Sequence, residues 1–145
     1  MKIKKYLQHS PLFAISAAYE ALIPKVNKQL RADDLNLLQG LVLTALFFEE
    51  GGEARPSQLA EIFQTSRGNM SHIISHLEYK GYVKRRLDDK DARSFRIELK
   101  AEGRKKALTL IRFYDRIQNL FEKELGIRSC QKTAEGIQSL LKIQF

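Results

Sequence analysis

The sequence is poor in the residues that build covalent or metal-based frameworks. It has 145 residues, of which one is cysteine and three are histidine. A single cysteine forms no internal disulfide, and a zinc ribbon with four cysteine ligands is excluded. His72 and His76 stand one helical turn apart, a spacing that suits a metal, but no third ligand lies near them in the sequence. We therefore expect neither a metal nor a cofactor.

Long apolar runs are also lacking. The most apolar stretch, residues 35–48, is shorter than the roughly 20 residues that span a bilayer, so it reads as a buried core helix. Residues 2–18 combine early lysines with a short apolar segment, as a secretion signal does, but Gln8, His9 and Ser10 interrupt the apolar run. We expect a cytoplasmic protein with no membrane partner. Secretion is the weaker alternative.

Patterns that carry catalysis are missing as well. The chain has no phosphate-binding glycine loop and no arrangement of a nucleophile with a base. Asp88, Asp89 and Asp91 lie together in a turn-rich segment, which is too exposed for a tuned pair of carboxylates. These absences predict that the protein is not an enzyme. The 43% hydrophobic and 29% charged residues are typical of one globular domain.

Positive charge is the most informative feature that is present. The formal net charge is +8, and the 40 residues from Arg67 to Lys106 hold 12 basic and 6 acidic residues, which is +6 of that total. An evenly scattered excess indicates a solvated surface, whereas an excess concentrated in one segment favours a polyanionic partner.

The first half of the chain has helical periodicity. Ser10 and Pro11 predict a helix start, and Pro24 should kink or divide that helix before it ends near Lys28. Three more helices follow, over residues 34–49, from Pro56 onward, and from the N-cap Ser66 to Gly81.

The second half changes to a period of two and then returns to helix. Residues 82–87 and 95–99 predict a two-stranded hairpin with a charged turn at 88–94. A long helix over 101–125 and a short one near 133–143 complete the chain. The fold class is mainly α with a small β-hairpin wing (α+β). We expect 34–106 to form a winged helix-turn-helix DNA-binding region, and 1–33 and 107–145 to form a helical region.

The helix that begins after Ser66 has one apolar and one polar face. A B-DNA major groove admits one α-helix, whose N-terminal side chains reach base edges while basic groups beside it contact phosphates. Arg and Asn form paired hydrogen bonds with guanine and adenine respectively. The predicted DNA-binding residues come from this helix and the hairpin: Ser66, Arg67, Asn69, Met70, Ser71, His72, Ser75, His76, Arg85, Arg86, Lys90, Asp91 and Arg93.

Several motifs in this order resemble the MarR family of bacterial transcription regulators. They are Pro-Ser-Gln-Leu-Ala-Glu at 56–61, Ser-Arg-Gly-Asn-Met-Ser-His-Ile-Ile at 66–74, Leu-Glu-Tyr-Lys-Gly-Tyr-Val at 77–83, Arg-Arg at 85–86, and Asp-Ala-Arg-Ser at 91–94 followed by Leu99 and Gly103. The resemblance covers residues 10–143. Lys100 and Arg55 depart from it, because each replaces a residue that commonly caps the following helix.

The resemblance implies a homodimer that interleaves its N- and C-terminal helices and acts on a pseudo-palindromic operator, as a repressor. The helix at 67–80 would enter the major groove and Arg93 the minor groove, with Asp91 orienting Arg93 or holding the wing. The long 101–125 helix would link the DNA lobe to the dimer lobe. Many relatives release DNA when a small aromatic or lipophilic effector fills a crevice between lobes; no residue set in the sequence identifies it.

Two other interpretations stay open. The apolar stripe of the long helix, with Ile111, Tyr114 and Ile117, also suits a winged-helix protein-interaction or adaptor module without DNA binding. Cys130, which we place in the loop before the last helix, would be a redox sensor if Arg128 and Lys132 lower its pKa, or an incidental thiol.

Overall fold

In the computed structural model, which describes all residues from Met1 to Phe145, the chain divides after Ala107 into two units. Leu108–Phe145 form the second unit. The helices of the chain are α1 (Lys2–Leu7), α2 (Pro11–Leu30), α3 (Leu37–Phe48), α4 (Pro56–Ile62), α5 (Arg67–Tyr79), α6 (Ala101–Leu125) and α7 (Ile127–Leu140), with short 3-10 turns η1 (Arg31–Asp33) and η2 (Glu50–Gly52).

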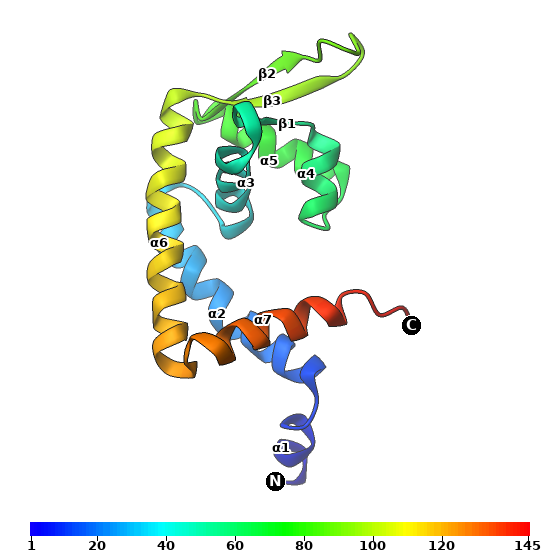
Figure 1. Cartoon of the computed structure of the whole chain (residues 1–145), viewed down its shortest axis with the longest axis vertical. Helices are drawn as coiled ribbons and strands as arrows, with labels where there is room; N and C mark the ends of the chain where they lie inside the picture. The colour runs from blue at the N-terminus through cyan, green and yellow to red at the C-terminus, as the bar shows by residue number, and fades with distance from the viewer. The chain divides into compact units, whose positions relative to one another are not determined.

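The sheet of the first unit has three antiparallel strands in the order β1-β3-β2, as Figure 1 shows above α3, α4 and α5. They are β1 (Glu53–Ala54), β2 (Val83–Leu87) and β3 (Phe95–Leu99), with Val83 opposite Leu99 and Leu87 opposite Phe95. The hairpin is the one predicted from the sequence. The strand β1 was missed because two residues carry no detectable period.

The core of the first unit lies between α3, α4, α5 and the sheet. Its side chains are apolar and almost without exposure, and each contributes roughly 1.5–3 kcal/mol by leaving water. The largest are Val42, Leu43, Leu46, Leu59, Met70, Ile74, Leu77, Val83 and Ile97.

Three helix predictions need correction. Pro24 lies inside α2 and does not divide it, because a 20-residue helix that packs on α3 tolerates the loss of one hydrogen bond. The third helix begins after Asn36, which closes a capping box with Gln39. The last helix begins at Ile127 and not near residue 133, so Cys130 is in a helix rather than in a loop.

Gly103, one glycine of the sequence motif, lies where the start of α6 approaches the backbone of Tyr82 closely. A Cβ atom built at Gly103 would lie 2.0 Å from the carbonyl oxygen of Tyr82, which accepts a hydrogen bond from the Lys100 backbone at 2.9 Å. The start of α6 therefore touches the backbone that enters β2, and only glycine fits there.

The second unit contains the rest of α6 and all of α7. Residues 131–145 are exposed throughout, including Ile137, Leu140 and Leu141. Burial raises the pKa of the Tyr114 hydroxyl, which has no hydrogen-bond partner, to about 12. No helix of the chain has the length and apolar character needed to cross a membrane.

Candidate nucleic-acid interface

The helix α5 presents its N-terminal residues in a fixed orientation. Ser66 is its N-cap, with a side-chain oxygen that accepts from the Asn69 backbone N–H at 3.0 Å. The apolar face packs through Met70, Ile73, Ile74 and Leu77, all buried. The opposite face is therefore held toward solvent by the core and not by its own polar groups.

Most of the predicted contact residues of α5 lie on that exposed face. Arg67, Ser71 and His72 are exposed, and the Arg67 and His72 side chains have no hydrogen-bond or ion-pair partner. Asn69 is also exposed, with its amide nitrogen donating to the Thr65 hydroxyl at 2.8 Å. A ligand that docks here meets one unpaired guanidinium and several short polar side chains.

Two predicted residues of α5 have other roles. Met70 has no exposed surface, so the expectation that it contacts DNA is wrong: its position on the helix places it in the core. The ring nitrogen Nε2 of His76 lies 2.7 Å from the backbone carbonyl oxygen of Asp34, which ties α5 to the segment before α3. No group of His, Cys, Asp and Glu in the chain could hold a metal ion.

The two arginines of β2 are paired with protein groups. The guanidinium of Arg85 stacks 5.0 Å from the Phe95 ring centroid, donates to Ser75 at 3.0 Å and lies 3.3 Å from a Glu78 carboxylate oxygen. Arg86 is held by Glu53 and by Asp89 at 3.0 Å. The hydrogen bonds that Arg86 donates to Glu53 and Asp89 raise the pKa of Arg86 above its ordinary value. Arg85 thus ties β2 to α5 and to β3, and Arg86 ties β2 to β1 and to the turn after β2.

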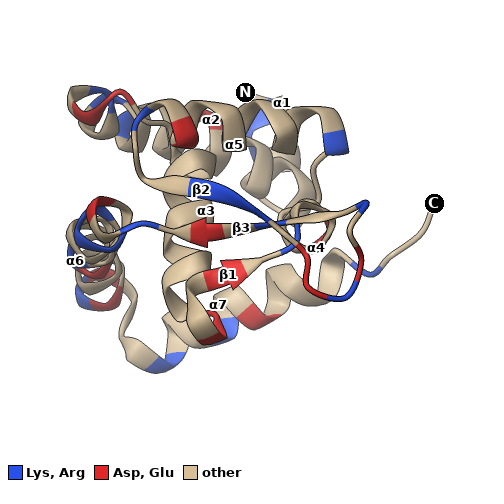
Figure 2. Cartoon of the chain, turned by 90° about the horizontal axis from the view of Figure 1, so that it is seen from above, with Lys and Arg blue, Asp and Glu red and all other residues tan.

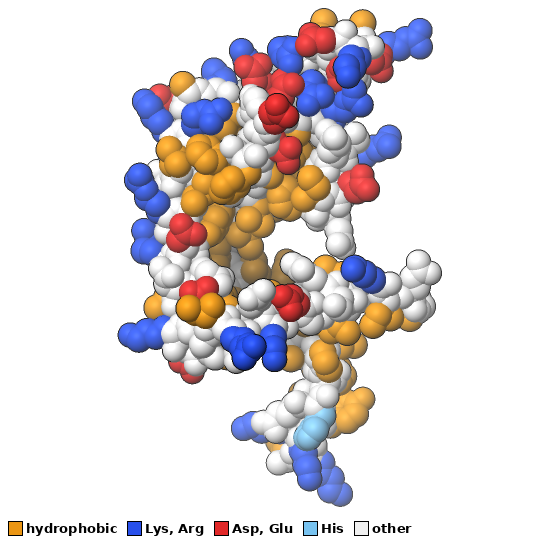
Figure 3. Space-filling view, in the orientation of Figure 1, with side chains coloured by type: hydrophobic (Ala, Val, Ile, Leu, Met, Phe, Trp, Pro, Cys, Tyr) orange, Lys and Arg blue, Asp and Glu red, His pale blue; other side chains and the backbone are white.

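Charges of opposite sign alternate across the three strands. Figure 2 shows basic residues along β2 beside acidic residues on β1 and β3, and Figure 3 shows both kinds gathered over the wing. Lys84 lies 3.5 Å from Glu98, and Arg96 lies 2.9 Å from Glu53. The net positive charge of the segment is consequently less available than its residue count suggests.

The wing tip, residues 88–94, contains two basic side chains that have no partner in the chain. Asp91 accepts from the Arg93 backbone N–H at 3.0 Å, and its carbonyl accepts from the Ser94 N–H at 3.0 Å, which closes the turn. The Arg93 and Lys90 side chains are exposed and have no partner in the chain. With Arg67, they are the predicted cations that remain ready for an anion.

One functional pair was not anticipated. Arg55, the residue before Pro56, places its guanidinium 2.8 Å from the carboxylate of Asp88, the one charged residue of the chain that is buried. Its side chain has no acceptor for a helix cap, and Gln58 accepts from its backbone N–H instead at 3.0 Å. The sequence signal was the departure from the usual capping residue at this position.

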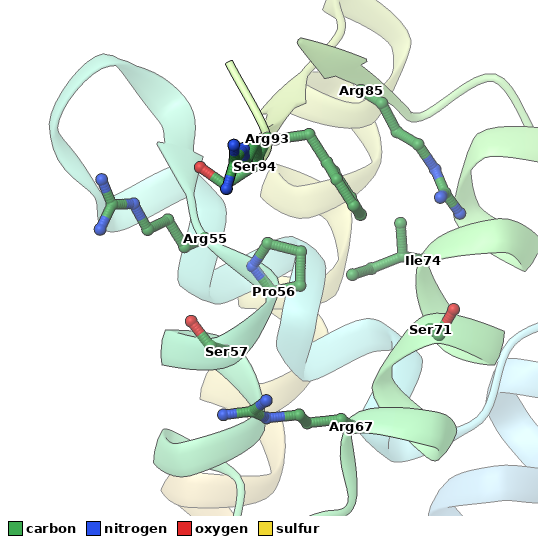
Figure 4. Close-up of a pocket in the computed structure, with 10 residues that line it drawn as sticks. Arg55, Pro56, Ser57, Arg67, Ser71, Ile74, Arg85, Arg93 and Ser94 are labelled. Carbon is green, nitrogen blue, oxygen red and sulfur yellow. The ribbon is translucent and has the colours of Figure 1, made fainter. Parts of the chain in front are cut away.

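A cavity of about 420 Å³ opens between α4, α5 and the wing. Figure 4 shows Pro56 and Ile74 in its middle, with Arg67, Arg85 and Arg93 around them. The structure thus brings together cations that lie up to 26 positions apart in the sequence, from Arg67 to Arg93. An apolar floor ringed by guanidinium groups suits an anionic surface with flat apolar parts, such as a duplex groove.

The sequence model of the MarR family matches residues 33–94 of the chain. The transcriptional repressor MprA of Escherichia coli K12 is 32% identical over 82 residues, which are 57% of this chain and 47% of MprA. The chain spans about half the length of such curated relatives.

Solved structures match over nearly the whole chain. MepR of S. aureus in complex with DNA aligns with a TM-score of 0.81 at 18% identity, covering 91% of this chain and 96% of MepR. The regulator BldR of Sulfolobus solfataricus aligns with a TM-score of 0.75 at 25% identity, covering 97% of each chain. The winged helix-turn-helix fold with N- and C-terminal helices, predicted from the sequence, is confirmed.

Proposed function

We propose that this chain is a DNA-binding transcription regulator of the MarR family, and that it represses transcription as a homodimer on a pseudo-palindromic operator. The observation that carries the proposal is the placement of unpaired Arg67 and Arg93 on one side of the first unit, beside the exposed polar face of α5. The similarity to transcription regulators supports the prediction that the chain is not an enzyme.

We propose that α5 enters the major groove and the wing the minor groove. Arg67, Asn69, Ser71 and His72 would face base edges, and Asn69 would exchange its bond with Thr65 for an adenine. Arg93 would enter a narrow, electronegative minor groove. Ser66, Ser75, His76, Arg85 and Arg86 would position these groups, while Lys90 would neutralise a phosphate.

Exposed apolar side chains at both ends of the chain support the homodimer. They belong to α1, α2, α7 and the C-terminal tail, and include Ile3, Tyr6, Leu12, Ile137, Leu140, Leu141, Ile143 and Phe145. So many apolar side chains in water disfavour a monomer, and a second copy offers the same surface in return. We therefore assign residues 1–33 and 107–145 to dimerisation.

A crevice within the first unit suits an effector. It encloses about 560 Å³ between α2, α3 and the α4–α5 connection, with Tyr19, Ile23, Leu41 and Phe63 among its lining residues. This mostly apolar lining fits a small aromatic or lipophilic molecule. Binding there would shift α5 relative to α2, and we expect salicylate, as a probe, to raise the apparent Kd for DNA.

Selected-site sequencing with the purified protein tests the DNA-binding proposal. We expect an inverted repeat whose half-sites lie about 10 base pairs apart, or a multiple of this spacing, because the dimer places two recognition helices on one face of the duplex. Asn69→Ala should relax the preference at one base pair per half-site. A flat selection at low salt would contradict the proposal and favour the adaptor interpretation.

Arg93→Ala gives the matching electrostatic test. It should weaken binding to every sequence and reduce the slope of log K against log salt by about 1. Arg128→Ala is the matched control, since it removes the same charge from α7, outside α5 and the wing. Equal losses in the two variants would argue against a wing contact.

Sedimentation equilibrium tests the homodimer separately. Replacing Leu140 and Leu141 together by Asp should produce monomers, because it places charges on the exposed apolar surface that we assign to dimerisation. The monomers should also lose cooperative operator binding. A wild-type chain that sediments as a monomer at micromolar concentration would refute this part.

A further inference from the structure

The wing tip is attached to the rest of the fold by charge and not by apolar packing. Between Asp88 and Ser94 no large apolar residue is present, and Leu87, the last residue of β2, is exposed. Asp88 is the buried exception at this point, with 6% of its surface exposed. A buried carboxylate is costly unless it is paired, so its partners define what this residue does.

The two carboxylate oxygens of Asp88 have different partners. Oδ1 accepts from the Lys90 backbone N–H at 2.9 Å, which shapes the turn. Oδ2 accepts from Arg55 Nε at 2.9 Å and lies 3.9 Å from Arg96 Nη1. The Lys90 hydrogen bond, followed by Arg55, lowers the pKa of Asp88 against the opposing effect of burial. The ionised form thus joins the turn to Arg55.

Arg55 belongs to a different part of the fold. It precedes α4, the first helix of the helix-turn-helix, and the Gln58 side chain holds its backbone N–H. The pair therefore spans 33 positions of sequence and connects the helix-turn-helix directly to the start of the wing tip. Asp89 and Asp91 make no such connection: their partners are Arg86 and the turn backbone.

We propose that Arg55 and Asp88 are positioning residues for DNA binding: their ion pair sets the direction of the wing relative to α4 and α5, and so places Arg93 over the minor groove. The inference rests on the proposed function. It follows from the geometry because Arg55 and Arg93 line the same cavity, and the pair is the charged contact that joins the wing tip to the helices (Figure 4).

Removing one negative charge at position 88 or at position 89 distinguishes a positioning role of Asp88 from a purely electrostatic effect on DNA binding. Asp88→Asn keeps the acceptor for Lys90 but turns an amide toward Arg55, so the pair is lost while the net charge rises by one. Asp89→Asn makes the same charge change one residue later, at a side chain that is 83% exposed. Electrostatics alone predicts tighter DNA binding in both variants.

We expect D88N to bind its selected operator about tenfold more weakly than wild type, a loss of about 1.4 kcal/mol, while D89N binds equally well or better. Thermal unfolding controls for the fold. If D88N binds as tightly as D89N, the proposal is overturned.

A second variant removes the pair from the other side. Arg55→Gln also removes a positive charge, so its effect is measured both in wild type and in Arg93→Ala. If Arg55 acts through Arg93, the loss caused by R55Q should nearly vanish in the R93A background, a coupling that direct phosphate contact would not produce. Additive losses would overturn the proposal.

A measurement without DNA separates this inference from the proposed function. Amide hydrogen exchange at residues 88–94 should accelerate in D88N and R55Q but not in D89N, while α5 stays protected. If no DNA binds the wild-type protein and this exchange pattern holds, the proposed function fails and the structural pair stands. Unchanged exchange in D88N and R55Q overturns the pair.

Discussion

The helix α5 and the wing are held in place by different physical means. Four buried apolar side chains hold α5, which leaves Arg67, Ser71 and His72 exposed on the opposite face. The wing tip lacks an apolar core and depends on Asp88, Arg55 and the ion pairs around Glu53. Apolar packing is insensitive to salt and acid, whereas ion pairs respond to both. We therefore expect α5 and the wing tip to lose their folded structure under different conditions of salt and pH.

The largest effect is expected from a loss of the apolar packing that holds α5. Met70→Ala should lower the free energy of unfolding by about 2–5 kcal/mol, because it leaves a cavity under α5. Urea unfolding measures it. Met70→Leu conserves the volume and should cost less than about 1.5 kcal/mol with DNA affinity kept. A selective loss of DNA binding in M70L would restore Met70 as a contact.

The second largest effect on the free energy of unfolding is expected at the junction between the wing and α6. Gly103→Ala forces a Cβ atom against the Tyr82 carbonyl, so we expect a loss of about 1–3 kcal/mol in the free energy of unfolding. Gly136→Ala in α7 is the matched control, with nothing within 4 Å of the added atom. It should stabilise α7 by about 0.5–1 kcal/mol. Similar effects at both sites would contradict the close contact.

Removing the ion pairs around Glu53 should lower the free energy of unfolding by a smaller amount. Glu53→Gln removes the shared partner of Arg86 and Arg96, which are only partly exposed, so a loss of about 1 kcal/mol is expected. The loss should shrink at high salt. Chemical denaturation with urea at two ionic strengths checks this. A salt-independent effect would indicate lost packing instead.

The smallest expected effect is a difference between α5 and the wing tip in their response to acid. The folded structure lowers the pKa of Asp88 below its ordinary value of 3.8, so its stabilisation is complete above that value and is lost as the pH falls through the lowered one. Amide exchange in the wing tip should rise at acid pH before exchange in α5 does. Asp88→Asn should abolish this difference. An equal response in α5 would show that the two elements open together.

Periodicity and capping residues predicted most elements of the fold, including α5, the hairpin strands and α6, because these signals are local. The strand β1 escaped because its pairing with β3 is decided by residues more than 40 positions away. The continuity of α2 through Pro24 also depends on packing, here against α3, that local patterns do not encode.

The candidate site divides in the same way. Arg67, Asn69 and Arg93 could be selected from residue type and motif, and the structure places them on exposed surface. Met70 could not be excluded by type alone, since its burial follows from the helix orientation. Arg85 and Arg86 counted as free cations in the sequence, but their acidic partners come from other elements.

The sequence by itself determined the resemblance to the MarR family, the order of most elements and the concentration of basic residues, because each depends on residue identity and short spacing. Only the tertiary structure decided which of those charges are available. Ion pairs such as Arg55 with Asp88 and Arg86 with Glu53 join positions 33 residues apart, and no local pattern specifies them. Among the predicted contact residues, folding therefore leaves three cations without a partner, Arg67, Lys90 and Arg93, while it pairs Arg85 and Arg86 with acidic groups.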